Sequence, residues 1–309
     1  MTLRCIVVGL GVQGQKRRKH AGADYAGSVD PFVPDADWRR LEDVPIDAYD
    51  AALLCVPDEP KVALMTHLAR HGKHALVEKP LWAGSAAELH ALEAAARAGS
   101  ATFYTAYNHR FEPHYAALRG VLADGRLGRV YHVRMFYGNG TARLVRESQW
   151  RDEGAGVLPD LGSHLLDTLR FWFGDIPDDF RVVHAGRHEN RAPDHVQIAG
   201  GGTSGAPSFD LEMTLLSWRN HFTCDVYAEK GTAHIASLCK WGPSSLTLRT
   251  RVLPSGRPPE ETITLVQDDP TWALEYAHFK ALCARRAATD LSGDRWLLST
   301  LTRLGRAIA

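Results

Sequence analysis

A short apolar segment that ends in spaced glycines restricts the fold of this chain more than any other feature. The segment LRCIVVGLGVQGQ begins as a β-branched run, and residues 13–21 after it can form a helix. Its glycines have the spacing G-x-G-x-x-G and are Gly9, Gly11 and Gly14. A strand, this spacing and a helix are together typical of a dinucleotide-binding βαβ unit. The amides of Val12 and Gln13 at the helix N-terminus would then face a pyrophosphate.

The first half of the chain continues with strands and helices in alternation. Apolar runs predict further strands in the segments YAGSVD, YDAALLCVP, KHALVEKPL and ATFYTAY. This rhythm predicts an α/β fold that begins with a Rossmann-like, doubly wound parallel sheet. We expect the dinucleotide-binding domain at residues 1–118 and a second α/β domain at residues 119–309. The helices at the C-terminus of the second domain can pack back on the first.

Asp30 is the candidate for the acid that binds the ribose hydroxyls of adenosine. It ends the second predicted strand, 16 residues after Gly14, which is slightly short of the usual offset of about 20. Such an acid favours NAD, because a carboxylate repels the additional phosphate of NADP. The alternative is that Asp30 only opens a turn with Pro31. The basic run at residues 16–20 is expected to be a solvated helix face, although one arginine could reach a phosphate.

A second candidate site lies in the segment LPDLGSHLLD. If a helix begins near Pro159, then Asp160, His164 and Asp167 share one of its faces. An imidazole, with an ordinary pKa near ~6.5, is a suitable general base at neutral pH. The alternative is that Asp160 caps the helix and His164 is a buried histidine without a catalytic role.

Charge and composition exclude several classes of function. The 309 residues carry 36 basic and 36 acidic side chains, so no overall field favours nucleic acid or an anionic membrane. No apolar run approaches the ~20 residues that span a bilayer, and the apolar start is too short for a signal peptide. The five cysteines are widely spaced, which predicts reduced thiols, no metal site and a cytoplasmic location.

Several motifs together resemble the glucose-fructose oxidoreductase and inositol dehydrogenase family, often called Gfo/Idh/MocA. They are GLGVQG, LLCVPD, GKHALVEKPL, YNHRF, QWRDEGAGVLPDLGSHLLD and VYAEKGT. The resemblance implies a C-terminal α/β domain with a large, open, mainly antiparallel sheet. It also implies NAD or NADP as cofactor and a ring carbon of a sugar, inositol or related polyol as the reacting centre. Family members pair the free sheet faces, so we expect a homodimer or homotetramer.

The resemblance and the strand ends together nominate the site residues. The residues expected to be catalytic are Lys79, Asp160 and His164. Besides the glycine turn and Asp30, the expected cofactor-binding residues are Val56, Pro57, Glu78, Lys79 and Asn108. The expected substrate-binding residues are Arg110, Trp150, Arg151, Asp160 and His164. Further cations, Arg143, Arg146 and Lys240, would suit an anionic substrate.

The chain departs from the family pattern at two places that matter later. Between Asp30 and Asp50 there is room for only one short helix, around DADWRRLED, which predicts a trimmed sheet and a more open adenine site. Where many members have a histidine after the third strand, this chain has Lys61. By the resemblance, that position lies away from the chemistry.

The predicted function is NAD(P)-dependent transfer of a hydride between nicotinamide and a ring hydroxyl or keto carbon. Two alternatives share the fold. One is a redox-assisted glycosidase that recycles its cofactor, and the other is a dinucleotide-sensing regulator without catalysis. Lys79, Asp160 and His164 together argue against the regulator.

Overall fold

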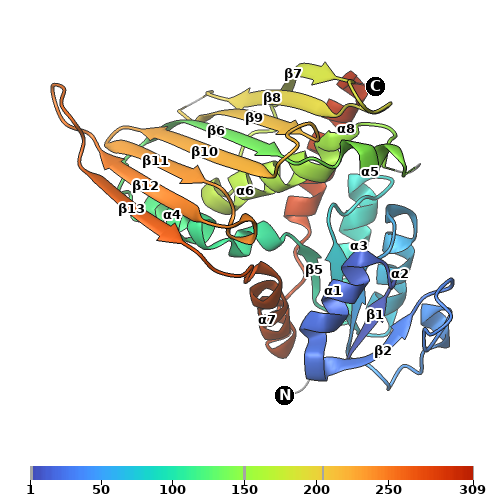
Figure 1. The fold of residues 1–309 in the computed structure, drawn as a ribbon. Coiled ribbons are helices and arrows are strands. Elements are labelled where there is room, and N and C mark those ends of the chain that lie inside the picture. The colour runs from blue at the N-terminus through green and yellow to red at the C-terminus, as the bar shows by residue number, and fades with distance from the viewer. Residues whose placement is uncertain (1–2, 149–150, 204, 309) are drawn as a thin grey trace. The chain divides into compact units, whose positions relative to one another are not determined.

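A computed structural model describes residues 3–148, 151–203 and 205–308 (Figure 1). The chain forms two compact units, of which the first comprises Met1–Asn108 and Thr271–Ser299 and the second His109–Pro270 and Thr300–Ala309. The division falls after Asn108 rather than at residue 118, because helix α4 (Pro113–Ala123) packs against a strand of the second unit. Helix α7 (Thr271–Ala284) belongs to the first unit, where it packs against helix α1 (Val12–Ala21).

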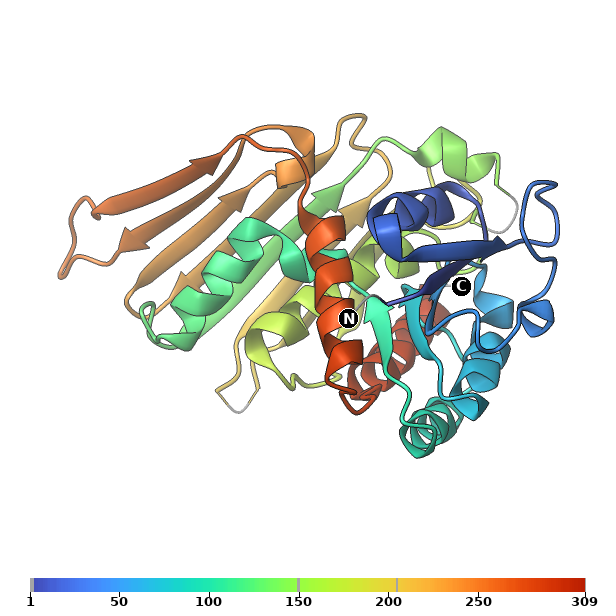
Figure 2. The same ribbon diagram turned by 90° about the horizontal axis from the view of Figure 1, so that it is seen from below.

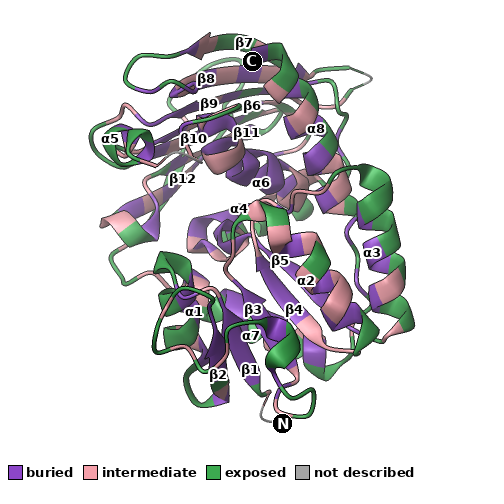
Figure 3. Ribbon diagram, turned by 90° about the vertical axis from the view of Figure 1, so that its right-hand side faces the viewer, coloured by how far each residue is buried: buried purple, intermediate pink, exposed green. Residues whose placement is uncertain are grey.

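The first unit is built on a five-stranded parallel sheet, which confirms the predicted doubly wound fold. Its strands run in the order β2-β1-β3-β4-β5. They are β1 (Cys5–Val8), β2 (Tyr25–Val29), β3 (Ala51–Leu54), β4 (His74–Glu78) and β5 (Phe103–Ala106). The central strands are buried along their length (Figure 3), as expected for a parallel sheet covered on both faces.

The helices of this unit fall into two groups. Helices α2 (Asp58–Arg70) and α3 (Ala86–Ala98) pack against each other, as α1 and α7 do. Along the sheet, the chain moves one way from β1 to β2 and the other way from β3 through β4 to β5. Since such crossovers are right-handed, the two groups of helices cover opposite faces of the sheet. Helix α3 begins after the N-cap Ser85, whose side chain accepts from the Glu88 amide.

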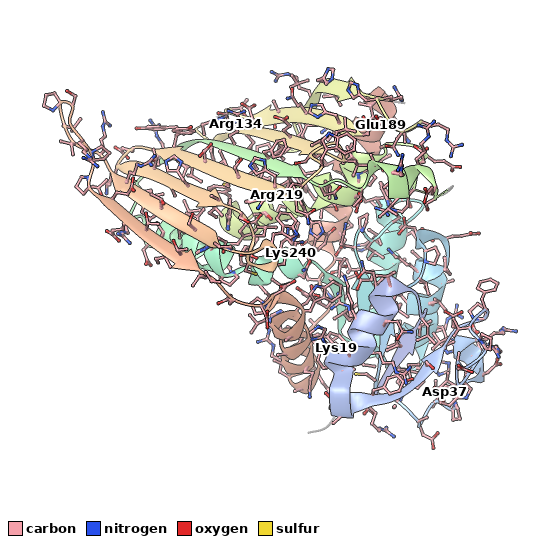
Figure 4. The ribbon with its side chains drawn as sticks, in the orientation of Figure 1. Lys19, Asp37, Arg134, Glu189, Arg219 and Lys240 are labelled. Carbon is pink, nitrogen blue, oxygen red and sulfur yellow. The ribbon has the colours of Figure 1, made fainter. Side chains whose placement is uncertain are left out.

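The predicted helix around residues 35–43 is wrong. The only helical turn there in the described chain is a short 3₁₀ turn at Leu41–Asp43. Asp37 accepts hydrogen bonds from the amide and hydroxyl of Ser28, both at 2.8 Å, and Trp38 forms a bridge with Val29. These contacts hold the segment extended along β2 (Asp37 is labelled in Figure 4), so tertiary pairing overrides the local helical pattern.

The basic run in α1 was predicted to be a solvated helix face, but one of its residues, Arg17, is buried. Arg17 is only 1% exposed, and its guanidinium donates to Glu78 and to Glu275, both at 2.7 Å. The guanidinium also lies 4.3 Å from the centre of the Trp272 ring. Arg17 therefore joins α1, the end of β4 and α7 through one buried ionic contact.

The second unit is an eight-stranded sheet with helices on one face (Figures 1 and 2). The strand order is β13-β12-β11-β10-β6-β9-β8-β7, in which β6 and β9 pair in parallel and the other described pairs are antiparallel. The strands are β6 (Val130–Gly138), β7 (Arg181–Gly186), β8 (His195–Gly201), β9 (Ser208–Thr214), β10 (His221–Ala228), β11 (Gly231–Ala236), β12 (Ser244–Thr250) and β13 (Glu260–Leu265).

Helices α4 and α6 (Ser163–Phe173) cover that face, and buried and more accessible residues alternate along β8 and β12. Two further helices are α5 (Ala142–Arg146) and α8 (Ser292–Ile308), and the latter contains the point at which the units divide. The five cysteines form no disulfide bond in the structure, and four of them are buried. Among the described residues, no helix is both long and apolar enough to cross a bilayer, and no cluster of side chains suits a metal ion.

The buried contact of Arg17 leads to a stability prediction. Replacing Arg17 by Met leaves Glu275 buried without its cation, so the free energy of unfolding should fall by about 3–5 kcal/mol. Urea unfolding followed by circular dichroism measures the loss. The control is Lys19→Met at an exposed position of the same helix (Figure 4), which should change stability by less than ~0.5 kcal/mol. Equal stability of the two variants would contradict the assignment.

Candidate active site

The glycine turn follows β1 and leads directly into α1. Gly9 has a φ of +90°, and a Cβ there would lie 2.5 Å from the carbonyl oxygen of Cys55. A Cβ on Gly14 would lie 1.9 Å from the carbonyl oxygen of Gly9, so both positions require glycine. A Cβ on Gly11 would meet no atom within 4 Å. The turn is therefore open at the N-terminus of α1, where helix amides lack partners within the helix and can receive a phosphate.

The predicted neighbours of this turn are in place. Val12 and Gln13 lie in the first turn of α1 and are exposed. Val56 lies beside the turn, since its Cγ1 would be 3.2 Å from a Cβ on Gly9, and Pro57 precedes α2. The strand order reverses between β1 and β3, and open α/β sheets bind ligands at the carboxyl ends of the strands at such a point.

Asp30 lies directly after β2, and its carboxylate accepts three hydrogen bonds from backbone amides. Its Oδ2 accepts from the Leu10 amide at 2.8 Å, and its Oδ1 accepts from the amides of Phe32 and Val33 at 2.8 and 3.1 Å. Burial alone would raise its pKa, but these three hydrogen bonds hold the pKa of Asp30 below its usual value. The carboxylate thus shapes the turn after Pro31, and it also ties the end of β2 to the glycine turn.

The segment Glu78-Lys79-Pro80 leaves the sheet at the end of β4. The Glu78 side chain accepts from Arg17, and its carbonyl oxygen accepts from the Lys61 ammonium at 2.7 Å. The same ammonium donates to the carbonyl oxygen of Pro80 at 3.0 Å. Lys61 therefore lies against the segment that carries Lys79, a contact that the sequence analysis did not anticipate.

Two other residues were predicted to bind ligands: Asn108 the cofactor and Trp150 the substrate. Asn108, at the start of a 3₁₀ turn (Asn108–Phe111), is buried, and its Nδ2 donates to the Thr271 hydroxyl at 2.9 Å. Its side chain therefore links the exit of β5 to the start of α7. Trp150 lies outside the residues that the structure describes.

In the second unit, the segment LPDLGSHLLD forms the predicted helix with one irregular turn. The residues Leu158–Gly162 form a π turn that continues directly into α6. Pro159 lies in this first turn, as expected. A π turn adds a residue to the helical repeat and is frequent at functional sites. Asp160 therefore lies in the widened turn, whereas His164 and Asp167 lie in the regular helix.

The two acids of this segment pair with the two arginines predicted to bind substrate. Asp160 accepts from Arg151 at 3.1 Å, and each side chain is about one third exposed. Asp167 is buried and accepts two hydrogen bonds from Arg110, at 2.9 and 2.5 Å. These two hydrogen bonds from Arg110 to Asp167 fix the position of the Arg110 guanidinium.

His164 lies in a cluster that the sequence analysis only partly anticipated. Its ring stacks on that of His109, with centroids 4.0 Å apart and planes inclined by 20°. Lys240 donates to His109 Nε2 at 3.4 Å and to the Tyr137 hydroxyl at 3.5 Å. The lysine also lies 4.9 Å from the Trp241 ring centre. The motif YNHRF contains His109, but no local pattern indicates that its ring meets His164.

Lys240 occupies the connection between β11 and β12 (Figure 4). The buried carboxylate of Glu112 holds this connection, because it accepts from the amide and thiol of Cys239 at 3.1 and 3.0 Å. Burial raises the pKa of Glu112. Within the described part of the chain, Lys240 forms no salt bridge, unlike Arg110 and Arg151.

A buried acid anchors the loop that carries Arg151. Asp152 accepts from the amides of Arg191 and Ala192 at 2.8 and 2.9 Å and from the Arg191 side chain at 3.1 Å. Gly156 has a φ of +52°, and a Cβ there would lie 2.1 Å from the Pro193 carbonyl oxygen. The loop is therefore clamped to residues 191–193 just before the π turn begins.

Comparison with known families assigns both parts of the chain. A model described as "Oxidoreductase family, NAD-binding Rossmann fold" matches residues 7–107. A second model of the same family, "GFO/IDH/MocA C-terminal domain", matches residues 115–234. Together they cover well over half of the chain.

Individual relatives are consistent with these matches. The chain is 32% identical over 181 residues to trans-1,2-dihydrobenzene-1,2-diol dehydrogenase of Bos taurus, which covers 58% of this chain and 52% of that protein. It is 30% identical over 191 residues to inositol 2-dehydrogenase of Rhizobium meliloti, which covers 57% of each. The chain thus spans about half the length of these curated relatives.

A solved structure reproduces the whole fold. UDP-N-acetylglucosamine 3-dehydrogenase from Acidithiobacillus ferrooxidans superposes with a TM-score of 0.83 at 18% identity, and the match covers 100% of this chain and 98% of that one. At this identity the likeness shows the fold. With the two family models, it leads to one conclusion: the chain belongs to the GFO/IDH/MocA oxidoreductase family, and its first domain is the NAD-binding Rossmann domain of that family.

Proposed function

We propose that this protein oxidises or reduces a ring carbon of a sugar, polyol or sugar derivative with NAD. One observation carries the proposal: the glycine turn and the segment with Lys79 leave the same edge of one parallel sheet, after β1 and β4, with only β3 between them. A cofactor whose pyrophosphate lies at the turn would extend along the edge that carries Lys79.

The first unit offers suitable groups for both the adenosine end and the nicotinamide end of this cofactor. The turn is open at Gly11, and the exposed first turn of α1 offers amides to a pyrophosphate. Asp30 is held ionised beside the turn, so we assign it to the adenosine ribose. Glu78 uses one carboxylate oxygen for Arg17 and is left with a second for the ribose on the nicotinamide side. When bound, NAD supplies the hydride acceptor.

The chain itself must remove a proton and stabilise the oxygen that loses it. We assign His164 as the general base, because an imidazole is largely neutral at pH 7 and can accept the hydroxyl proton. Lys79 is assigned as the cation that stabilises the developing alkoxide. Asp160 and Arg151, already paired with each other, would bind substrate hydroxyls, and Arg110 would do so from its support on Asp167.

We further propose a homo-oligomer in the cytoplasm. The free face of the eight-stranded sheet carries both signs of charge on neighbouring strands, with Arg134 on β6 opposite Asp210 on β9 and Glu212 two residues further along β9. Such a face can pair with a second copy of itself. The odd number and wide spacing of the five cysteines favour a reducing compartment.

A substrate panel tests the proposed reaction. Purified protein with NAD should form NADH on addition of myo-inositol, a trans-dihydrodiol or a UDP-sugar, and the absorbance of NADH measures the rate. Bond cleavage of a glycoside without net NADH would instead identify the redox-assisted glycosidase. Cofactor binding without either product would leave only the sensing role.

Asp30 should determine the choice of cofactor. The protein should bind NAD at least about tenfold more tightly than NADP, which corresponds to ~1.4 kcal/mol of repulsion of the additional phosphate. Asp30→Ala should reduce this ratio, as measured by titration of both cofactors. Asp37→Ala is the control, because it removes another anchor of the same segment and should affect both affinities equally. A preference for NADP in the wild type would show that Asp30 is misassigned.

His164 should determine the rate of oxidation. Its replacement by Ala should lower turnover about 10²–10⁴-fold and leave the Kd for NAD unchanged. Wild-type turnover should fall towards acidic pH, because protonation removes the base, and this limb should disappear in the variant. His221→Ala, at an exposed position of β10, is the control. Near-normal turnover with the same limb in His164→Ala would leave Lys79 as the candidate base.

A further inference from the structure

Lys61 is a buried cation whose environment is unusual for a lysine. It lies in the first part of α2, and its side chain is 2% exposed. The ammonium donates to the Asp58 carboxylate at 2.6 Å and to the carbonyl oxygens of Glu78 and Pro80 at 2.7 and 3.0 Å. Burial lowers the pKa of Lys61, whereas the carboxylate of Asp58 acts in the opposite direction.

The two carbonyl oxygens belong to the residues directly before and after Lys79. One ammonium therefore holds both ends of the three-residue segment from which the Lys79 side chain extends. Arg17, from α1, holds the Glu78 side chain at 2.7 Å. The backbone at Lys79 is thus fixed by two buried cations from two different helices.

The number of donors explains why a lysine suits this position. An ammonium has three N–H groups and no acceptor, and here each can meet one oxygen. Methionine, a neutral side chain of similar length, has no N–H group, so it would leave both backbone carbonyls without this partner. A buried charge is costly unless it is fully hydrogen-bonded, so the contact is retained only if all three partners stay in place.

We propose that Lys61 is a positioning residue that acts through Lys79: it fixes residues 78–80 so that the Lys79 ammonium is held where the reaction needs it. The inference deepens the proposed function and rests on the role assigned there to Lys79. A merely structural role for Lys61 would instead lower stability without a specific effect on catalysis.

Hydrogen exchange tests the structural half of the proposal without any substrate. In the full-length protein, Lys61→Met should accelerate amide exchange in the peptide that spans residues 78–84, as measured by mass spectrometry. Lys73→Met is the matched control, because Lys73 also donates to a carbonyl oxygen of the first unit, that of Tyr49, at 2.7 Å. Unchanged exchange in that peptide of Lys61→Met would overturn the proposal.

A double-mutant cycle tests the catalytic half with a substrate that yields NADH. Lys79→Met should lower kcat about 10²–10³-fold. Lys61→Met should lower kcat about 10- to 100-fold through misplacement, with little change in the KM for NAD. Added to Lys79→Met, it should lower kcat by less than about twofold further, because its target is already absent. Lys73→Met should leave kcat unchanged.

The outcomes separate this inference from the proposed function. Full turnover in Lys79→Met would refute the assigned role of Lys79, whereas loss in Lys79→Met with full turnover in Lys61→Met would refute only the positioning role. An equal loss from Lys61→Met in both backgrounds would also refute it. If Lys61→Met does not fold, Lys61→Gln replaces it, since its amide keeps two donors and should give intermediate kcat and exchange. Wild-type values in Lys61→Gln would then overturn the proposal.

Discussion

The buried guanidinium of Arg17 is the contact on which the arrangement of the first unit depends. It pairs with Glu78 and Glu275 and so brings α1, the end of β4 and α7 to one point. A charge removed from water is tolerated only with such complete pairing, which leaves these elements little freedom to shift. Because α1 starts at the glycine turn and β4 ends at Glu78, directly before Lys79, the same contact sets the distance between the two segments assigned to the cofactor.

Local requirements made much of this unit predictable from the sequence. Gly9 and Gly14 are needed because a Cβ would collide with nearby backbone, and such a requirement is visible as a glycine at a fixed spacing. The parallel strands were visible as apolar runs for a similar reason, since both of their faces are buried. The burial of Arg17 was not visible, because its two partners lie 61 and 258 residues away in the chain.

The candidate site of the second unit shows the same limit. Helical spacing predicted that Asp160, His164 and Asp167 share one face of a helix, but it could not indicate the π turn that holds Asp160 or the partner of each side chain. His109 and Lys240 reach the cluster from other parts of the unit. Similarly, residues 35–43 have a helical pattern, yet Asp37 and Trp38 pair with β2, a contact that propensity does not describe.

The discontinuous make-up of the first unit has a consequence for biosynthesis. A ribosome releases Arg17 early, but Glu275 follows 258 residues later, after the entire eight-stranded sheet has been made. Until then the nascent Rossmann sheet lacks α7 on the face that α1 also covers, and the cation has only one of its two carboxylates. Domains usually fold in order from the N-terminus during synthesis. Here the domain that begins first cannot acquire its complete set of contacts until nearly the whole chain has been made.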